Sequence, residues 1–229
     1  MEVGIMQTVS YRVHKHRDYK YPSIQIINVL VDKYVENIKN YYEFNIDEDI
    51  YIDLYDYFLE FPETRNRSCS LDVCRFIQWF EEEMNLASMI VMDFNEVASS
   101  ALTILDKVEI VLLIMKSRFY VSRSEMIDII NVAMDICEMT KTSTGNCNIS
   151  NNEYYREFVK YNLNLAYKIV KNKNENYAID VDKVKLLLDY PYAKEEAKQI
   201  GNLIISKYGY ELSKENIAYL GIYILIFSG

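Results

Sequence analysis

Two helices with clear start and stop signals are predicted in the C-terminal stretch 189–229, which constrains the fold more than any other segment. Pro191 begins the first helix and Gly209 ends it. Its apolar residues recur at spacings of three and four, the pattern of an amphipathic helix. They are Ala193, Ala197, Ile200, Ile204 and Tyr208. Ser213 offers a side-chain oxygen to cap a second helix. Because residues 217–227 are apolar almost all the way round, we expect this second helix to lie inside a core.

The scarcity of glycine and proline extends the helical interpretation to the whole chain. Only 6 glycines and 3 prolines occur among 229 residues, whereas Ile, Leu, Tyr, Asn, Lys and Glu are abundant. This composition favours helices over a twisted sheet. A chain of this length forms about one or two domains, with enough apolar material for a core in each. The sequence therefore predicts an all-α protein.

Capping signals and stripes predict further helices before residue 120. The first starts at Pro22 and carries an apolar stripe to Tyr42. Asp47 is the predicted N-cap of the second, which ends at Pro62. A third is expected over 71–84. Asp93 followed by Glu96 resembles a capping box, which predicts that a fourth helix starts there and covers 97–115.

Two more capping boxes mark helices in the second half. Ser122 with Glu125 begins a helix that we expect to reach Thr140, and Ser150 with Glu153 begins another. The apolar stripe of the latter consists of Tyr154, Phe158, Tyr161, Leu165 and Ile169.

The two halves resemble each other at a constant offset of 103 residues. The tetrapeptide Ile-Ile-Asn-Val at 26–29 recurs at 129–132, and Tyr51 recurs as Tyr154. A gap-free offset predicts a tandem duplication of a unit of about 100 residues, a usual domain size. The predicted organisation is a basic arm at 1–22, a first helical domain at 23–120 and a second at 121–229, each a five-helix type of bundle.

The overall charge disfavours nucleic acid as the main partner. The net charge is −9, and phosphate contacts require clustered Lys and Arg. The dense basic patch lies in the N-terminal arm, and it supports an alternative function as a nucleic-acid-binding regulator. The residues that would make the contacts are Arg12, Lys15, Arg17 and Lys20.

No feature predicts a metal, a cofactor or catalysis. The pair His14 and His16 has no second ligand cluster nearby, and the four cysteines match neither a zinc ribbon nor a redox pair, so free, mostly buried thiols are expected. They are Cys69, Cys74, Cys137 and Cys147. The carboxylate runs 81–83 and 195–196 have no histidine or phosphate loop beside them, so we interpret them as solvated faces.

The sequence also predicts a soluble, cytoplasmic protein without membrane contact. The N-terminus lacks the apolar core of a signal peptide. The apolar run 217–227 is shorter than the roughly 20 residues that a membrane-spanning helix needs.

The second half resembles a known regulatory domain. Its segments YYREFVKYNLNLAYKI and YPYAKEEAKQIGNLIISKYGYELSKENIAYLGIYI are similar to the PTS regulation domain of bacterial sugar-responsive antiterminators and activators. The matching positions are Ala193, Ala197, Gly209, Glu215, Tyr219 and Leu220. In the first half, FNIDEDIYIDLYDYFLEF is similar to the loop and second helix of this family.

This resemblance implies tandem helical bundles that dimerise and receive phosphate on histidines from the phosphocarrier HPr or a sugar-permease component. The chain departs from the family at those histidines. The middle-helix histidine falls at or beside Tyr161 in the second half and at Tyr57 or Phe58 in the first. Lys168 stands where the family has an arginine, Arg65 lies near the first-half position, and the last-helix histidine falls at Tyr223.

We therefore expect a regulatory, dimerising protein–protein interaction module of bacterial transcription regulation that lacks the phosphoacceptor histidines. The resemblance implies a homodimer, with a full-length transcription regulator or a PTS component such as HPr as further partners. The 21 tyrosines suit such interfaces, because Tyr offers rigid amphipathic area.

Overall fold

The computed structural model describes residues 22–42, 46–60, 73–98, 102–145, 153–172 and 189–228. Within these ranges the chain is helical and contains no strand, which confirms the predicted all-α class. The helices are α1 (Ile24–Tyr42), α2 (Asp49–Leu59), α3 (Val73–Trp79), α4 (Glu81–Ala98), α5 (Ile104–Phe119), α6 (Arg123–Thr144), α7 (Tyr155–Lys171), α9 (Pro191–Tyr208) and α10 (Lys214–Ser228). Among the described residues, no helix has the length and apolar composition needed to cross a membrane.

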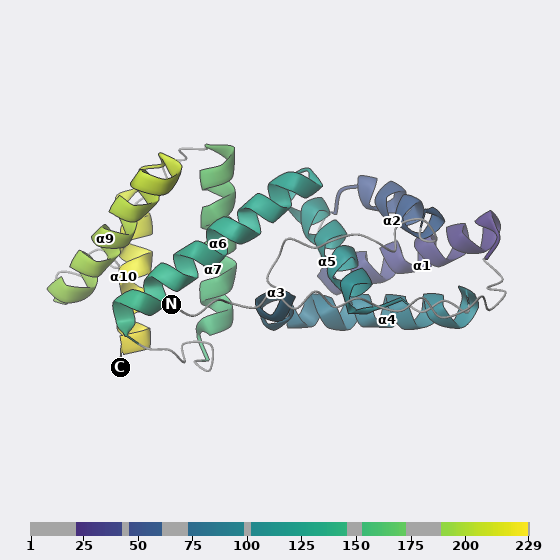
Figure 1. The fold of residues 1–229 in the computed structure, drawn as a ribbon, viewed down its shortest axis with the longest axis horizontal. Helices are drawn as coiled ribbons and strands as arrows, with labels where there is room; N and C mark the ends of the chain where they lie inside the picture. Colours follow the sequence, from purple (N-terminus) through teal and green to yellow (C-terminus); the bar gives the residue numbers. More distant parts are fainter. Residues whose placement is uncertain are drawn as a thin grey trace, which may run out of the picture.

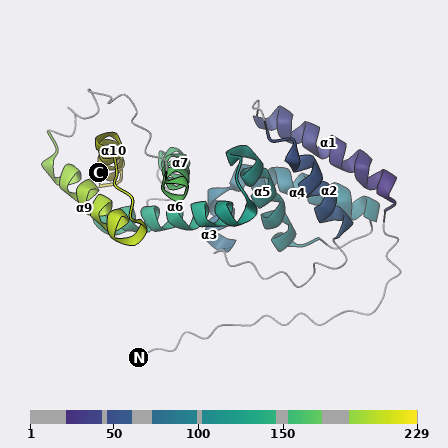
Figure 2. The same cartoon turned by 90° about the horizontal axis from the view of Figure 1, so that it is seen from above.

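The helices form two groups along the long axis of the molecule (Figure 1). The first group consists of α1 to α5, and the second of α6, α7, α9 and α10. Among the described helices, α5 and α6 make the only extensive helix–helix contact between the groups. Seen from above, α6 leads away from α5 and runs across the second group (Figure 2). The boundary of the predicted domains, at 120–121, lies in the connection between α5 and α6.

α5 is the central helix of the first group. Its residues 108–115 are all buried, because α2 and α4 pack against it in the first group and α6 packs against it from the second. The buried run includes the carboxylate of Glu109, which accepts two hydrogen bonds from Arg123 at 2.5 and 2.7 Å. A buried carboxylate requires such a partner.

Two of the helices expected in the first half differ from the sequence prediction. The segment 71–84 is not a single helix, because its described part divides at Phe80 into α3 and the start of α4. Hydrogen bonds continue through the break, from the N–H of Phe80 to the oxygen of Phe76 at 3.0 Å and from Met84 to Phe80 at 2.7 Å. The break is therefore slight.

The capping box predicted at Asp93 and Glu96 is wrong, because both residues lie inside α4. Phe94 is buried between them and stacks on Phe58 at a centroid distance of 4.3 Å. Burial against α2 therefore keeps this turn helical. Asp93 serves instead as the partner of Lys33 in an ion pair between α4 and α1.

The real capping box before α5 is formed by Thr103 and Asp106. The Asp106 carboxylate accepts the Thr103 N–H at 2.5 Å and the Thr103 hydroxyl at 2.8 Å. In the same half, the predicted N-cap Asp47 does accept a backbone N–H, from Asp49 at 3.2 Å, but the capping position of α2 is Glu48. Helix ends commonly differ by one or two residues between criteria.

The predicted ends of the helices in the second group are largely confirmed. Ser122 and Glu125 form the capping box of α6. Pro191 is the first residue of α9, and Gly209 ends it in the left-handed conformation at φ 66°. The Ser213 hydroxyl accepts a backbone N–H in the first turn of α10 at 3.2 Å.

The expected ends of α6 and α7 are tested only in part. α6 extends beyond the expected end at Thr140 and finishes at Thr144, where Gly145 takes the left-handed conformation. The proposed N-cap Ser150 lies outside the described residues, and α7 begins at Tyr155.

One expected cysteine environment is confirmed. The Cys137 side chain is free and buried, and it accepts an N–H from the amide of Asn162 at 3.0 Å. Burial raises the pKa of the Cys137 thiol to about 12. Cys69 and Cys147, and the side chain of Cys74, lie outside the described part of the chain.

The prediction that α10 lies wholly inside a core is wrong. One side, which carries Leu220, Gly221, Ile224 and Phe227, is buried, and α10 packs on α6 and α9. The other side is only half-buried. On the α9 side the packing is close, because a Cβ at Gly201 would lie 2.8 Å from Cδ1 of Ile217. Within the described residues, part of the apolar surface of α10 therefore remains accessible.

Candidate functional site

Aromatic side chains meet between α7 and α10. Phe158 and Tyr161 are three residues apart on α7, so they share one face of that helix. Tyr219, Tyr223 and Phe227 follow one another at intervals of four on α10. Both helices pack on α6, which places the two rows opposite each other. We call these five rings the α7–α10 aromatic cluster.

The rings of the cluster are in direct contact. Tyr161 stacks on Tyr219 at a centroid distance of 5.3 Å and lies 5.7 Å from Tyr223. Phe158 lies 4.9 Å from Tyr223 and 5.1 Å from Phe227. These distances are within the range in which aromatic pairs add about 0.5–1.5 kcal/mol to the area that they bury. The cluster thus joins α7 to α10 through side chains.

The hydroxyl of Tyr161 is held by Asn216 in the first turn of α10. It lies 3.2 Å from the Asn216 carbonyl oxygen and 3.3 Å from Oδ1, and it donates to this pair of acceptors. Burial raises the pKa of Tyr161 well above its usual range, and the charge of Glu215 acts in the same direction. A phenol is neutral at physiological pH even without this shift, unlike an imidazole, which titrates there.

The half-buried side of α10 carries a row of uncharged residues. The row consists of Tyr219, Ile222, Tyr223 and Ile226. Each lies three or four residues from two of the others, so all four share one face of the helix, and all are partly exposed. We call these four residues the α10 stripe. Two of them, Tyr219 and Tyr223, also belong to the aromatic cluster. The stripe is thus an apolar surface whose position is fixed by rings packed beneath it.

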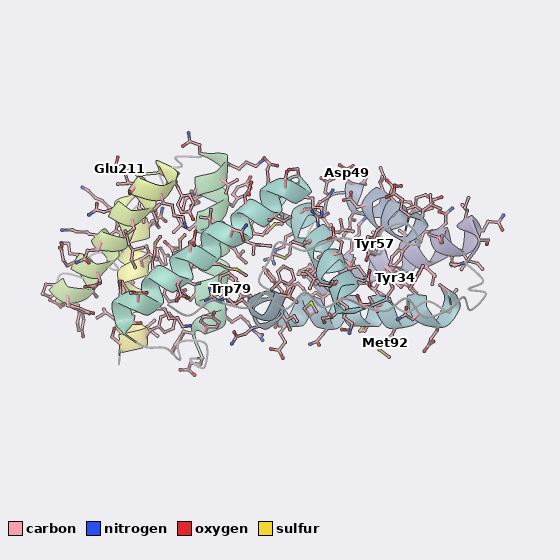
Figure 3. All side chains as sticks on the ribbon, viewed as in Figure 1. Tyr34, Asp49, Tyr57, Trp79, Met92 and Glu211 are labelled. Carbon is pink, nitrogen blue, oxygen red and sulfur yellow. The ribbon has the colours of Figure 1, made fainter. Side chains whose placement is uncertain are left out.

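The corresponding positions in the first half lie elsewhere and are fully packed. Tyr57 is buried and its hydroxyl donates to Asp106 of α5 at 2.7 Å. Phe58 is completely buried and touches both Tyr57, at 5.4 Å, and Phe94. Figure 3 labels Tyr57 within the first group of helices. The structure therefore brings Tyr161 and Tyr223 together but keeps the first-half pair apart from them.

The other predicted site residues differ in what the structure shows. Lys168 lies in the last turn of α7, seven residues beyond Tyr161, and Glu215 lies in the first turn of α10. Arg65, the basic arm (Arg12, Lys15, Arg17 and Lys20) and the histidines His14 and His16 are outside the described residues. Within the described residues, no group of three or more His, Cys, Asp or Glu side chains is arranged to hold a metal ion.

Sequence reasoning missed part of this site. Asn216 was not singled out, although it is buried and holds the Tyr161 hydroxyl. The signal for the cluster was present in the regular spacing of Tyr219, Tyr223 and Phe227. Only the ring contacts with Phe158 and Tyr161 show that this row faces α7.

Comparisons with known proteins add no assignment. No protein-family model matches the chain, and no curated protein matches its sequence.

Proposed function

We propose that this chain is a regulatory, dimerising protein–protein interaction module of bacterial transcription regulation that resembles PTS regulation domains but lacks their phosphoacceptor histidines. One observation carries the proposal. Tyr161 and Tyr223 stand at the two positions that the resemblance assigns to histidines, and their rings lie 5.7 Å apart on separate helices. Two positions far apart in sequence thus form one site.

The chemistry of this site supports an interaction role over phosphate transfer. A phosphohistidine donor transfers its phosphoryl group to an imidazole nitrogen, whereas Tyr161 offers a neutral phenol engaged with Asn216. Phosphorylation of a regulatory domain acts by adding charge at an interface. With aromatic rings at both positions, the interface keeps a constant, uncharged character.

The α10 stripe is the surface that we assign to the partner, and a second copy of the chain is the partner that fits it. A twofold axis brings the same patch of both subunits together, so the patch must be complementary to itself. Tyr219, Ile222, Tyr223 and Ile226 carry no charge and therefore cause no repulsion across such an axis. Aromatic residues are also enriched at the cores of interfaces. A full-length transcription regulator or HPr could bind in addition to the second copy.

The dimer surface is tested by placing a charge on the stripe. Ile222→Lys introduces an ammonium at a half-buried position of the stripe, and we expect it to shift sedimentation from dimer to monomer, because a buried unpaired charge is strongly unfavourable. Ile205→Lys is the matched control, since Ile205 is 45% exposed on α9 and outside the stripe. Equal dimerisation of both variants would contradict the assignment, provided that their circular dichroism spectra match the parent.

A further inference from the structure

The two groups of helices are joined by one short reversal of the chain. Tyr120 ends α5 in the left-handed conformation at φ 53°, and α6 begins at Arg123. The Val121 N–H bonds to the oxygen of Lys116 at 3.1 Å, which closes the end of α5. Phe119 touches Tyr167 at 5.7 Å beside this reversal. Together with the packing of α5 on α6 and the Arg123–Glu109 ion pair, these contacts hold the connection itself.

Away from the pivot, a cavity separates the groups. It has a volume of about 510 Å³. Trp79, Phe80 and Met115 line it from the first group, and Tyr155 and Val159 line it from the second. Figure 3 labels Trp79 at the end of α3, where the first group approaches the second. Phe80, Met115 and Val159 are buried, whereas Trp79 and Tyr155 are only half-buried, so apolar packing between the groups is incomplete on this side.

Polar contacts bridge this gap instead. The Trp79 indole N–H donates to the Tyr155 hydroxyl at 2.7 Å. Arg156 of α7 pairs with Glu82 of α4, and its second nitrogen lies 3.8 Å from Glu81. A further ion pair at 3.0 Å joins Arg75 of α3 to Glu138 of α6.

These bridges are weak individually because their charges are in solvent. The Arg156 and Glu82 side chains are 54% and 43% exposed. Exposed pairs of this kind contribute about 0.2–1 kcal/mol each, and salt screens them.

We propose that the two groups open and close about the α5–α6 connection, and that the contacts of Trp79, Arg156 and Arg75 form a salt-sensitive latch. In the closed form, which is the one described above, Trp79 is bonded to Tyr155 and the ion pairs are intact. In the open form the ion pairs are broken and Trp79 is exposed to solvent, while the helices themselves stay folded. This inference does not depend on the proposed function, because it rests on the junction between the groups alone.

The wild-type chain reports on the latch directly, because Trp79 is its only tryptophan. Quenching of tryptophan fluorescence by acrylamide is measured from about 0.05 to about 1 M NaCl, a range over which the screening length falls severalfold. We expect quenching to rise and the radius of gyration from X-ray scattering to increase, at constant helical circular dichroism. Salt-independent quenching and radius would overturn the proposal.

A variant pair separates the latch from general electrostatics. Arg156→Gln removes the pairs with Glu82 and Glu81, and we expect about a two- to fivefold rise in the open-to-closed ratio at low salt. Lys33→Gln is the control, because the Lys33–Asp93 pair has nearly the same exposure, 55% and 39%, but lies within the first group. Identical quenching in Arg156→Gln and Lys33→Gln would contradict the latch.

A second variant covers the case in which Arg156→Gln does not fold. Tyr155→Phe keeps the ring but removes the hydroxyl that accepts the Trp79 N–H. It should raise quenching at low salt and reduce the further change on adding salt. If it leaves the quenching profile unchanged, the Trp79–Tyr155 bond is not part of a latch.

Discussion

The same tetrapeptide, Ile-Ile-Asn-Val, occurs in α1 and in α6, yet its side chains have different environments. Ile27 and Ile130 are both completely buried. Ile26 is 43% exposed, whereas its counterpart Ile129 is completely buried. Val29 and Val132 differ still more, at 69% and 6% exposure. Identical local sequence therefore forms the same helix in both places but does not fix how much of it is buried.

The neighbouring helices explain this difference. α1 packs on α2 and α4, so one face is covered and the rest meets solvent. α6 packs on α7, α9 and α10 in its own group and on α5 in the other. A helix enclosed on several sides buries residues that an amphipathic helix exposes. The position of α6 at the junction between the groups therefore determines its burial.

A similar contrast separates Phe58 from Tyr161, which are also 103 positions apart. Phe58 is completely buried and stacks on Phe94. Tyr161 is half-buried, and its hydroxyl bonds to Asn216. Phe58 therefore lies inside the core, whereas Tyr161 lies at the boundary between the core and the surface.

The largest expected effect is a loss of stability, and it should distinguish Phe58 from Tyr161. Phe58→Ala should destabilise the protein by about 3–5 kcal/mol, because it leaves a cavity in the core. Tyr161→Phe keeps the ring and removes one hydrogen bond, so it should cost only about 1 kcal/mol. Urea denaturation of both variants measures the difference. Equal losses would show that the two positions have the same structural role.

A slightly smaller effect is expected at the repeated tetrapeptide. Ile129→Ala should cost about 2–5 kcal/mol, since this side chain is completely buried in α6. Ile26→Ala should change stability by less than about 0.5 kcal/mol, as is usual for exposed positions. The same denaturation measurement applies, and a cost at Ile26 comparable to that at Ile129 would contradict the burial described for α1.

The smallest expected effect is on the pH dependence of stability. It arises in the first turn of α6, which carries an acidic residue where α1 has none. A hydrogen bond from Lys171, followed by bonds from Ser122, lowers the pKa of Glu125 from 4.5 to about 2. A lowered folded-state pKa stabilises the protein above the unfolded-state value, and this contribution is lost as the pH falls from about 4.5 towards 2. Glu125→Gln should therefore flatten the pH dependence of stability in this window. Identical pH profiles for variant and parent would exclude the effect.

The sequence could predict what depends on local chemistry. Pro191, Gly209 and Ser213 mark helix ends because a fixed φ, a left-handed conformation and a side-chain acceptor act within one turn.

What the sequence could not predict depends on distant neighbours. Asp93 and Glu96 have the spacing of a capping box, but burial of Phe94 on Phe58 keeps α4 helical there. The all-round apolar character of α10 did not reveal that one side remains half-buried. Likewise, the bond from Trp79 to Tyr155 joins helices whose arrangement no local pattern contains.

Sedimentation of the wild-type chain, alone and with HPr, enzyme I and phosphoenolpyruvate, tests most directly whether aromatic rings have replaced a phosphoacceptor in a dimerising module. We predict a dimer of about twice the 27.1 kDa chain mass. We also predict that the dimer does not change when the phosphate donors are added and gains no acid-labile label. A monomer at every concentration, or a dimer whose mass or labelling depends on phosphoenolpyruvate, would contradict the proposal of a dimerising module without a phosphoacceptor.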